Sequence, residues 1–417
     1  MAIGYACLTI GVPDSGMKRL TLSQVTEKTL FDCCEHNLSH LKNILLYNRE
    51  NNLRFFRISS DIIPLASRVE NTLPWWEIFS QQLEELGSIA KQGSMRLSMH
   101  PGQYTVLNSP REDVVENAIE DLIYHARFLD SMGLDATHKL VLHVGGAYGN
   151  KDGALDRFAQ NFAKLPQGVK GRLILENDDK LYTIGEVLAL ARQVGCPAVF
   201  DNLHHSLNTD KTDKSEQTWI EECATTWKAE DGRQKIHYSQ QDPKKKQGSH
   251  SPTISLDDFL AFHAELPDKG IDIMLEVKDK NISALKCMHC LEGTTEQRLY
   301  DQWLNYLPLV TERDPSKVWE FEQLCKDGTD TKGLSLAFYS LLEKVLGLEI
   351  DRDQAAITAE AVAEKCCKTE AEKRQLLARI ALYAKAEIDL DKLKQSIQNL
   401  AEKHAVHEVL RSYYTMM

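Results

Sequence analysis

Short apolar segments recur along the first two thirds of the chain and predict β-strands. Several are nearly continuous apolar runs, such as LVLHV and IDIMLE, as expected for strands that are buried on both faces of a parallel sheet. The eight predicted strands are Ile3–Ile10, Leu53–Ser59, Met95–His100, Lys139–Val144, Arg172–Glu176, Ala198–Asp201, Lys235–Tyr238 and Ile271–Glu276.

The segments between these strands place apolar residues three and four positions apart, which predicts amphipathic helices. The helix candidates are Val114–Met132, Leu155–Leu165, Ile184–Val194 and Leu256–Leu266. Strand and helix patterns that alternate eight times favour an α/β fold of the (β/α)8 TIM-barrel type. An open doubly wound sheet is the alternative architecture.

The pattern changes from about Leu299 onward, where strand-like runs stop and Leu, Ala, Glu and Lys dominate. Helical periodicity covers Leu334–Leu346, Glu370–Ala386 and Leu390–Val406. We therefore expect a TIM-barrel domain over residues 1–298 and an all-helical C-terminal extension over residues 299–417. The expected boundary lies between Thr294 and Asp314.

Composition is that of an ordinary folded protein, since 42% of the 417 residues are apolar and 26% are charged. No stretch approaches the roughly 20 apolar residues that span a bilayer, so we expect no membrane partner. Met1–Leu8 lacks a basic segment followed by a long apolar run, so no secretory signal is expected. The ten cysteines form no regular framework, which predicts reduced thiols in the cytoplasm.

One cysteine spacing resembles half of a metal site. Cys287-Met288-His289-Cys290 has no second half nearby, whereas structural zinc sites normally need four ligands. We therefore expect a solvated turn with two free thiols at this position, with a structural zinc site as the alternative.

The net charge of −12 argues at first against a nucleic-acid partner. Binding is decided by local basic patches, however, because charges more than about 10 Å apart are largely screened. The densest basic run is Lys244-Lys245-Lys246, which lies shortly before His250. We interpret this run as a basic patch that contacts nucleic-acid phosphates, with a solvated loop as the alternative.

Six consecutive predicted strands each carry a His, Asp or Glu at or near the C-terminal end. In a TIM barrel these ends meet at one face, where active-site loops gather. Buried carboxylates without a cation cost several kcal/mol each, by order of magnitude, so the pattern predicts a metal centre rather than isolated core residues. The six residues are His100, His143, Glu176, Asp201, His237 and Glu276.

Loops add further histidines, namely His204, His205 and His250. Mixed imidazole and carboxylate ligands suit Zn²⁺, Mn²⁺ or Fe²⁺ better than Ca²⁺ or Mg²⁺. The number of ligands exceeds the need of one ion and fits two or three ions that share a bridging carboxylate. Lys235 lies two residues before His237, so both side chains point to the same side of a strand. Such a lysine either contacts phosphate, is carboxylated, or turns to solvent.

Five motifs in these segments resemble UV damage endonucleases. They are HPGQYTVLNSP, HVGGAYGNK, LENDDKLYT, FDNLHH and LEVKDK, between His100 and Lys280. The resemblance covers roughly Ile3 to Lys286 and implies a barrel related to endonuclease IV. It further implies an enzyme that nicks double-stranded DNA on the 5′ side of ultraviolet photoproducts, leaving a 3′-hydroxyl and a 5′-phosphate. We expect a monomer, although the sequence does not determine the oligomeric state. The implied cofactor is a cluster of two or three divalent ions, most often manganese, with zinc or magnesium as alternatives.

The same resemblance implies roles for individual residues. One ion would lie between His100, His143 and Glu176. The second would lie between Glu176, Asp201, His237 and Glu276, and the third would involve His204 and His250. Glu176 and Lys235 would be catalytic, the latter as a lysine that can be carboxylated. Residues implied to contact DNA are Gln103 and Tyr104, which would enter the duplex at the lesion, and Tyr5.

One residue departs from the family pattern. Arg68 stands where the family usually has a histidine, and a guanidinium cannot act as a metal ligand. Either the third metal site has fewer protein ligands here, or Arg68 replaces the charge of a metal and holds a phosphate. Two other functions remain as alternatives. The first is a two-metal sugar isomerase or epimerase, and the second is a protein that binds lesions without cutting.

Overall fold

The computed structural model describes residues 1–326 and 331–416. The chain divides into two compact units, one of Met1–Leu8 and Asp14–Ala284, the other of Thr9–Pro13 and Leu285–Met417. The first unit contains eight parallel strands in the order β6-β5-β4-β3-β2-β1-β8-β7. The strands are β1 (Ile3–Ala6), β2 (Phe55–Ile58), β3 (Arg96–Met99), β4 (Lys139–His143), β5 (Leu173–Glu176), β6 (Ala198–Val199), β7 (Lys235–Tyr238) and β8 (Asp272–Leu275).

The predicted TIM barrel is confirmed, and each predicted strand contains an observed one. The first strand is shorter than predicted, ending at Ala6 instead of Ile10. Cys7 has a φ of 69°, which takes the chain out of extended geometry. The barrel closes between β6 and β7 through one bridge, Asp201 with His237, in addition to the hydrogen bond from His237 N to Phe200 O at 2.9 Å.

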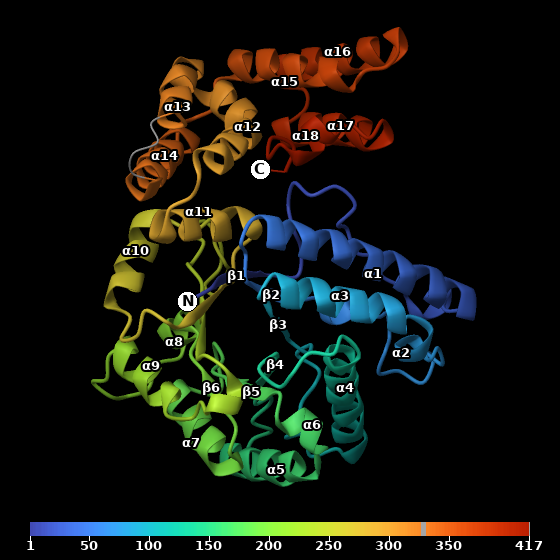
Figure 1. Cartoon of the computed structure of the whole chain (residues 1–417), viewed down its shortest axis with the longest axis vertical. Helices are drawn as coiled ribbons and strands as arrows, with labels where there is room; N and C mark the ends of the chain where they lie inside the picture. The colour runs from blue at the N-terminus through green and yellow to red at the C-terminus, as the bar shows by residue number, and fades with distance from the viewer. Residues whose placement is uncertain (327–330, 417) are drawn as a thin grey trace. The chain divides into compact units, whose positions relative to one another are not determined.

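Helices surround the strands of the first unit (Figure 1). The four helices predicted within the barrel correspond to α4, α5, α7 and α10. The helices up to the end of this region are α1 (Glu27–Glu50), α2 (Trp75–Ile78), α3 (Ser80–Gln92), α4 (Glu112–Ser131), α5 (Lys151–Lys164), α6 (Gln167–Lys170), α7 (Ile184–Val194), α8 (Asn202–Leu207), α9 (Glu216–Ala224), α10 (Leu256–Glu265) and α11 (Asn281–Glu292).

Helix α7 illustrates how the sequence sets these elements. Thr183 caps its first turn by accepting a hydrogen bond from Glu186 N, and Thr183 N in turn donates to the Glu186 side chain. Gly195 ends the helix at a φ of 76°, a left-handed conformation that favours glycine. Ile184, Val187, Leu188, Leu190 and Ala191 are buried, so the helix turns an apolar face to the barrel.

Helix α3 meets the end of α4 at Gly87. A Cβ atom on Gly87 would lie 1.7 Å from the backbone oxygen of Met132, so no side chain fits without moving the helix. Gly87→Ala should therefore lower the free energy of unfolding by about 1–3 kcal/mol or more, as overpacking does in cores. Gly168→Ala in α6 is the matched control, because no atom lies within 4 Å of its added Cβ. If the urea midpoint of unfolding shifted equally in both variants, the close approach of Gly87 to Met132 would be contradicted.

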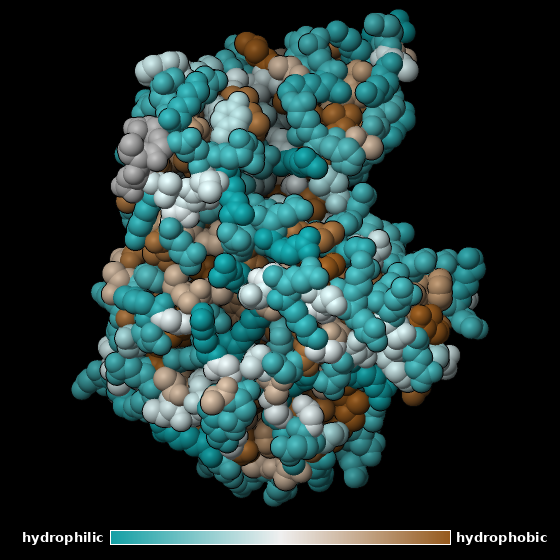
Figure 2. All heavy atoms as spheres, in the orientation of Figure 1, coloured by the Kyte–Doolittle hydropathy of each residue, from teal (hydrophilic) through white to brown (hydrophobic). Residues whose placement is uncertain are grey.

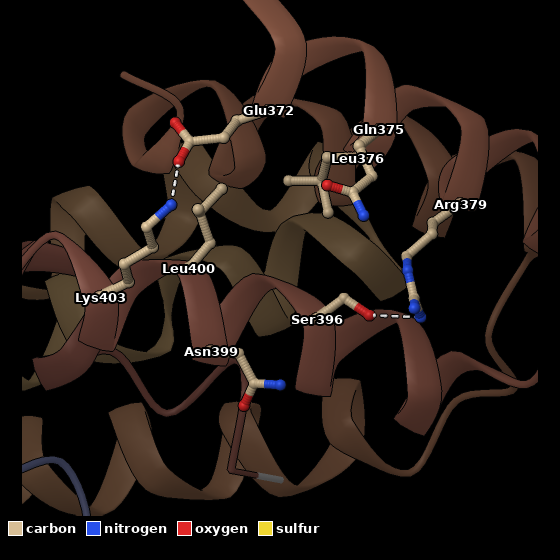
Figure 3. Close-up of a pocket in the computed structure, with 8 residues that line it drawn as sticks. All are labelled: Glu372, Gln375, Leu376, Arg379, Ser396, Asn399, Leu400 and Lys403. Atoms are coloured by element: carbon tan, nitrogen blue, oxygen red, sulfur yellow. Dashed lines mark hydrogen bonds and ion pairs between the residues drawn. The ribbon is translucent and has the colours of Figure 1, made fainter. Parts of the chain in front are cut away.

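The second unit is helical in the part of the chain that the structure describes. Its helices after α11 are α12 (Glu296–Arg313), α13 (Val318–Leu324), α14 (Thr331–Leu346), α15 (Arg352–Cys366), α16 (Glu370–Ala384), α17 (Leu390–Lys403) and α18 (His407–Arg411). Helices α16 and α17 flank a groove that is crossed by two polar pairs (Figure 3). Lys403 Nζ lies 2.7 Å from Glu372 Oε1, and Arg379 Nη1 donates to Ser396 Oγ at 2.8 Å.

The prediction of a solvated turn at Cys287–Cys290 was wrong. These residues lie within α11, where Cys287 and Cys290 are buried, and neither is part of a disulfide among the described residues. Cysteine packs as a small apolar residue, so a spacing of three residues on a helix turns both thiols inward.

The surface side chains shown in Figure 2 are mainly hydrophilic, with apolar residues appearing singly or in small groups. None of the described helices is long and apolar enough to cross a membrane.

Candidate metal centre

The C-terminal ends of β3 to β8 bring the predicted ligands together. Seven of them form three overlapping groups, and within each group the ligand atoms lie within 4.8 Å of one another. Glu176 belongs to all three groups. The groups are His100, His143 and Glu176; Glu176, Asp201 and His204; and Glu176, His237 and Glu276.

Glu176 is the centre of this arrangement. It ends β5, is buried, and has both carboxylate oxygens against imidazole nitrogens. Oε2 lies 3.1 Å from His100 Nε2 and 3.5 Å from His143 Nε2, while Oε1 lies 2.5 Å from His237 Nδ1. Burial acts to raise the pKa of Glu176, but His237, His143 and His100 together hold it well below its usual value. The carboxylate is therefore charged at neutral pH.

Asp201 and His204 form the second part of the centre. Asp201 follows β6 and caps α8, and its Oδ1 accepts from His204 N at 2.8 Å. Burial raises the pKa of Asp201 to about 7, against the opposing effect of His204. Burial lowers the pKa of His204, but Asp201 and Glu176 outweigh it and raise the value to about 9. Both pKa values lie above their usual range because several carboxylates are buried close together, an excess of negative charge that a metal cation would offset.

Glu276 follows β8 and contacts residues of three other elements. His237 Nδ1 lies 3.4 Å from its Oε1, and His250 Nε2 lies 3.7 Å from its Oε2. Arg57 of β2 forms an ion pair with Oε1, and both side chains are nearly buried. Burial acts against the charged guanidinium, but Glu276 raises the pKa of Arg57 above its usual value. Arg57 was not predicted as part of the site from the sequence. The signal was its place inside the apolar strand LRFFRIS, where a buried cation requires a carboxylate partner.

Lys235 lies on β7 inside the barrel. Its side chain is fully buried, and its Nζ has no hydrogen-bond partner among the described residues. Burial, together with the nearby Arg96 and Arg57, lowers the pKa of Lys235 well below its usual value. Burial therefore favours the neutral amine form of Lys235, and the side chain does not turn to solvent.

The donor set fits divalent cations. Three ligands each carry a buried polar atom with no hydrogen-bond partner in the described part of the chain, namely His143 Nδ1, Asp201 Oδ2 and His237 Nε2. Imidazole nitrogens and carboxylate oxygens in this mixture suit Zn²⁺, Mn²⁺ or Fe²⁺. The grouping differs from the expected one in two respects. Asp201 lies with Glu176 and His204 instead of with His237 and Glu276. His204 and His250 do not share a group among the described residues, and His250 lies beside Glu276.

The remaining loop histidine does not join the groups found among the described residues. His205 is buried, and its ring centroid lies 5.2 Å from that of Phe200.

The loop after β3 presents Gln103 and Tyr104 to solvent. Tyr104 is 69% exposed, which is unusual for a tyrosine, and Gln103 is also exposed. The turn beneath them is fixed, because Thr105 N donates to Gly102 O at 2.9 Å and Thr105 Oγ1 donates to Asp121 Oδ2 at 2.6 Å. The exposed pair is therefore presented on a rigid support.

Of the other residues predicted to contact DNA, Arg68 and the three lysines are exposed, whereas Tyr5 is buried. Arg68 is exposed, acts electrostatically on Tyr104, and belongs to none of the three ligand groups of the described residues. Lys244, Lys245 and Lys246 are exposed in the loop after β7. Tyr5 is fully buried, and its hydroxyl donates to Asn48 Oδ1 at 2.7 Å. This position does not support a direct DNA contact by Tyr5.

Fold and ligand set together define a (β/α)8 barrel with a candidate metal centre at the mouth of the barrel. The family model described as UV-endonuclease UvdE matches residues 1–302. The chain belongs to this family of endonucleases.

Individual relatives agree with this assignment. The chain is 39% identical over 350 residues to a UV DNA damage endonuclease of Clostridium perfringens (strain 13 / Type A), covering 83% of each chain. It is 35% identical over 303 residues to a UV DNA damage endonuclease of Bacillus cereus (strain ATCC 10987 / NRS 248), covering 70% of this chain and 95% of that protein. The crystal structure of SacUVDE matches with 41% identity and a TM-score of 0.66, covering 70% of this chain and 98% of that chain.

Proposed function

We propose that the protein nicks double-stranded DNA on the 5′ side of ultraviolet photoproducts, among them cyclobutane pyrimidine dimers and 6-4 photoproducts. Water adds to phosphorus, the bond from phosphorus to the 3′-oxygen breaks, and that oxygen takes up a proton. The products are a 3′-hydroxyl and a 5′-phosphate. The observation that carries this proposal is Glu176, one buried carboxylate shared by three groups of metal-type ligands at the barrel mouth.

The residues that would hold the ions are those of the three groups, with His250 beside Glu276. When bound, divalent ions supply Lewis-acid stabilisation of the charge that develops in a phosphodiester displacement. The protein itself holds Glu176 in position through three imidazoles and keeps Glu276 charged through Arg57. Manganese is the proposed cofactor, with zinc or magnesium as alternatives.

We assign Lys235 a role through its neutral amine. An unprotonated, buried amine can add to carbon dioxide and lose a proton, which converts it into an anionic carbamate. A carbamate at this position would add an anionic group to the ligand set, and Arg57 and Arg96, which act electrostatically on Lys235, would stabilise its negative charge.

An irradiated supercoiled plasmid tests the proposed function. Incubation with the protein and Mn²⁺ should convert irradiated plasmid, but not undamaged plasmid, to the nicked form. A duplex with one defined photoproduct then gives the cleavage position, and polymerase extension of the product reports the 3′-hydroxyl. Lesion-selective retardation without nicking would favour a damage-binding protein. Turnover of a sugar with no effect on DNA would favour an isomerase or epimerase.

Tyr104→Ala should weaken the preference for irradiated over undamaged plasmid by about tenfold, because base–aromatic stacking is worth about 1–3 kcal/mol. The exposed ring on a fixed turn is suited to fill the gap where damaged bases leave the stack. Tyr104→Phe keeps the ring and should keep most of the preference. Tyr300→Ala, at another exposed tyrosine, is the matched control. An unchanged preference in Tyr104→Ala would reject this role.

A further inference from the structure

A basic hollow lies beside the candidate metal centre. It is formed by the loops that follow β7 and β8, and it shares His250 with the centre. Three lysines from two separate loops converge on it, although only one of them belongs to the Lys244–Lys246 run. The lining residues are Lys245, Gly248, Ser249, His250, Val277, Lys278 and Lys280.

The loop after β7 is held in shape before any ligand arrives. Gln241 and His250 form an antiparallel bridge, and Asp242 N donates to Ser249 O at 2.7 Å. The Gln241 side chain closes the loop, because its Oε1 accepts from Gly248 N at 2.7 Å. Gly248 itself has a φ of 83°, a conformation that favours glycine.

The loop after β8 is tied to the first loop by its backbone. Lys278 N donates to Ser251 O at 3.2 Å, and Asp279 N donates to Pro252 O at 3.0 Å. The backbones of the two loops therefore form one unit, so an anion would have to order the lysine side chains but not the loops that carry them.

The charges in the hollow are only partly balanced. Lys278 Nζ lies 3.1 Å from Asp242 Oδ2, which neutralises one of the three lysines. Neither Lys245 nor Lys280 forms an ion pair with a carboxylate in the part of the chain that the structure describes. Carboxylates act on both lysines without a direct ion pair, Asp242 on Lys245 and Glu276 with Asp279 on Lys280. In a protein with a net charge of −12, two lysines that lack an ion-pair partner among the described residues and lie beside a candidate metal centre indicate a site for an anion.

We propose that this hollow binds a phosphodiester group of the DNA backbone, next to the phosphate that is cleaved. This inference rests on the proposed function. Lys245 and Lys280 donate to the phosphate oxygens, and Lys278 remains paired with Asp242. The metal centre is left for the reacting phosphate, because His250 is the one candidate ligand among the residues that line the hollow. The site positions the strand and takes no part in bond breaking.

Lys245→Ala, Lys280→Ala and the double variant test this site. Removing a lysine that contacts phosphate weakens binding about equally for all sequences and lowers the salt dependence of binding. The double variant should lose about tenfold or more in kcat/KM through KM, with kcat within about twofold of wild type. The slope of log(kcat/KM) against log[KCl] should fall by about one in the double variant, because both lysines hold one phosphate. Lys91→Ala, at an exposed lysine before β3 and hence at the opposite end of the barrel, is the control.

Two further measurements separate the outcomes. Fluorescence anisotropy with undamaged duplex reports backbone binding without nicking, so it tests the hollow even if the protein cuts no irradiated DNA. Added inorganic phosphate should compete with DNA in the wild type and less in the double variant. Competition by phosphate together with unchanged DNA affinity in the double variant would mean that the hollow holds a free anion only, and would overturn the proposal. An unchanged salt slope would overturn it as well.

Discussion

Glu176→Gln should reduce nicking of irradiated DNA by about 10²- to 10⁴-fold while leaving the barrel folded. The substitution keeps the volume of the side chain but removes the one negative charge that all three ligand groups share. Loss of one partner from a buried charge cluster costs about 3–5 kcal/mol, and each 1.4 kcal/mol corresponds to a tenfold change in an equilibrium constant.

The metal content of the variant separates a binding defect from a chemical one. Glu176→Gln should retain less Mn²⁺ after dialysis than the wild type, and excess Mn²⁺ should restore little nicking. Glu230→Gln is the matched control, since Glu230 is exposed in the turn before β7 and hence at the opposite end of the barrel. Wild-type nicking by Glu176→Gln with full metal content would show that the metal centre does not depend on this carboxylate.

Arg57→Met should lower the stability of the metal-free barrel by about 3–5 kcal/mol, because it leaves Glu276 buried without its cation. The loss should be smaller with Mn²⁺ present, since the ion would supply positive charge to the same carboxylate. Amide hydrogen exchange of the barrel strands is the suitable measurement, because it reports local stability apart from the C-terminal unit.

A double-mutant cycle with Glu276→Gln isolates the pair. The double variant should be more stable than the sum of the two single changes predicts, since neither charge is then left alone. Arg111→Met is the control for an exposed pair, because the Arg111 side chain is 71% exposed beside Asp113 and its loss should leave stability almost unchanged. If Arg57→Met lowered stability equally with and without Mn²⁺, Arg57 would not be coupled to metal binding.

The fold was largely predictable because parallel barrel strands are buried on both faces and therefore stand out as apolar runs. Helix α1 was not identified, since its inner face includes the buried polar residues Asn37 and Asn48, which interrupt the apolar period. The segment Cys287–Cys290 did not stand out as helical because its cysteines, which pack as small apolar residues in α11, also have the spacing of half a metal site.

Strand-end ligands were predictable because the TIM barrel gathers the ends of its strands at one face. Contacts that depend on tertiary structure could not be predicted from the sequence. Arg57 faces Glu276 across 219 residues of sequence, and Lys278 and Lys280 meet Lys245 only because two loops are hydrogen-bonded to each other. Tyr5 shows the opposite case, since a residue expected at the DNA surface lies in the core.

The single bridge that joins β6 to β7 has a consequence for how the protein matures. Its two residues, Asp201 and His237, are both candidate metal ligands, and each shares a group with Glu176 of β5. Ions bound there would cross-link the one junction of the barrel that lacks a full ladder of hydrogen bonds. Because metal binding and folding are linked when ligands come from separate elements, metal supply would govern how long the protein survives in a cell as well as whether it can cut.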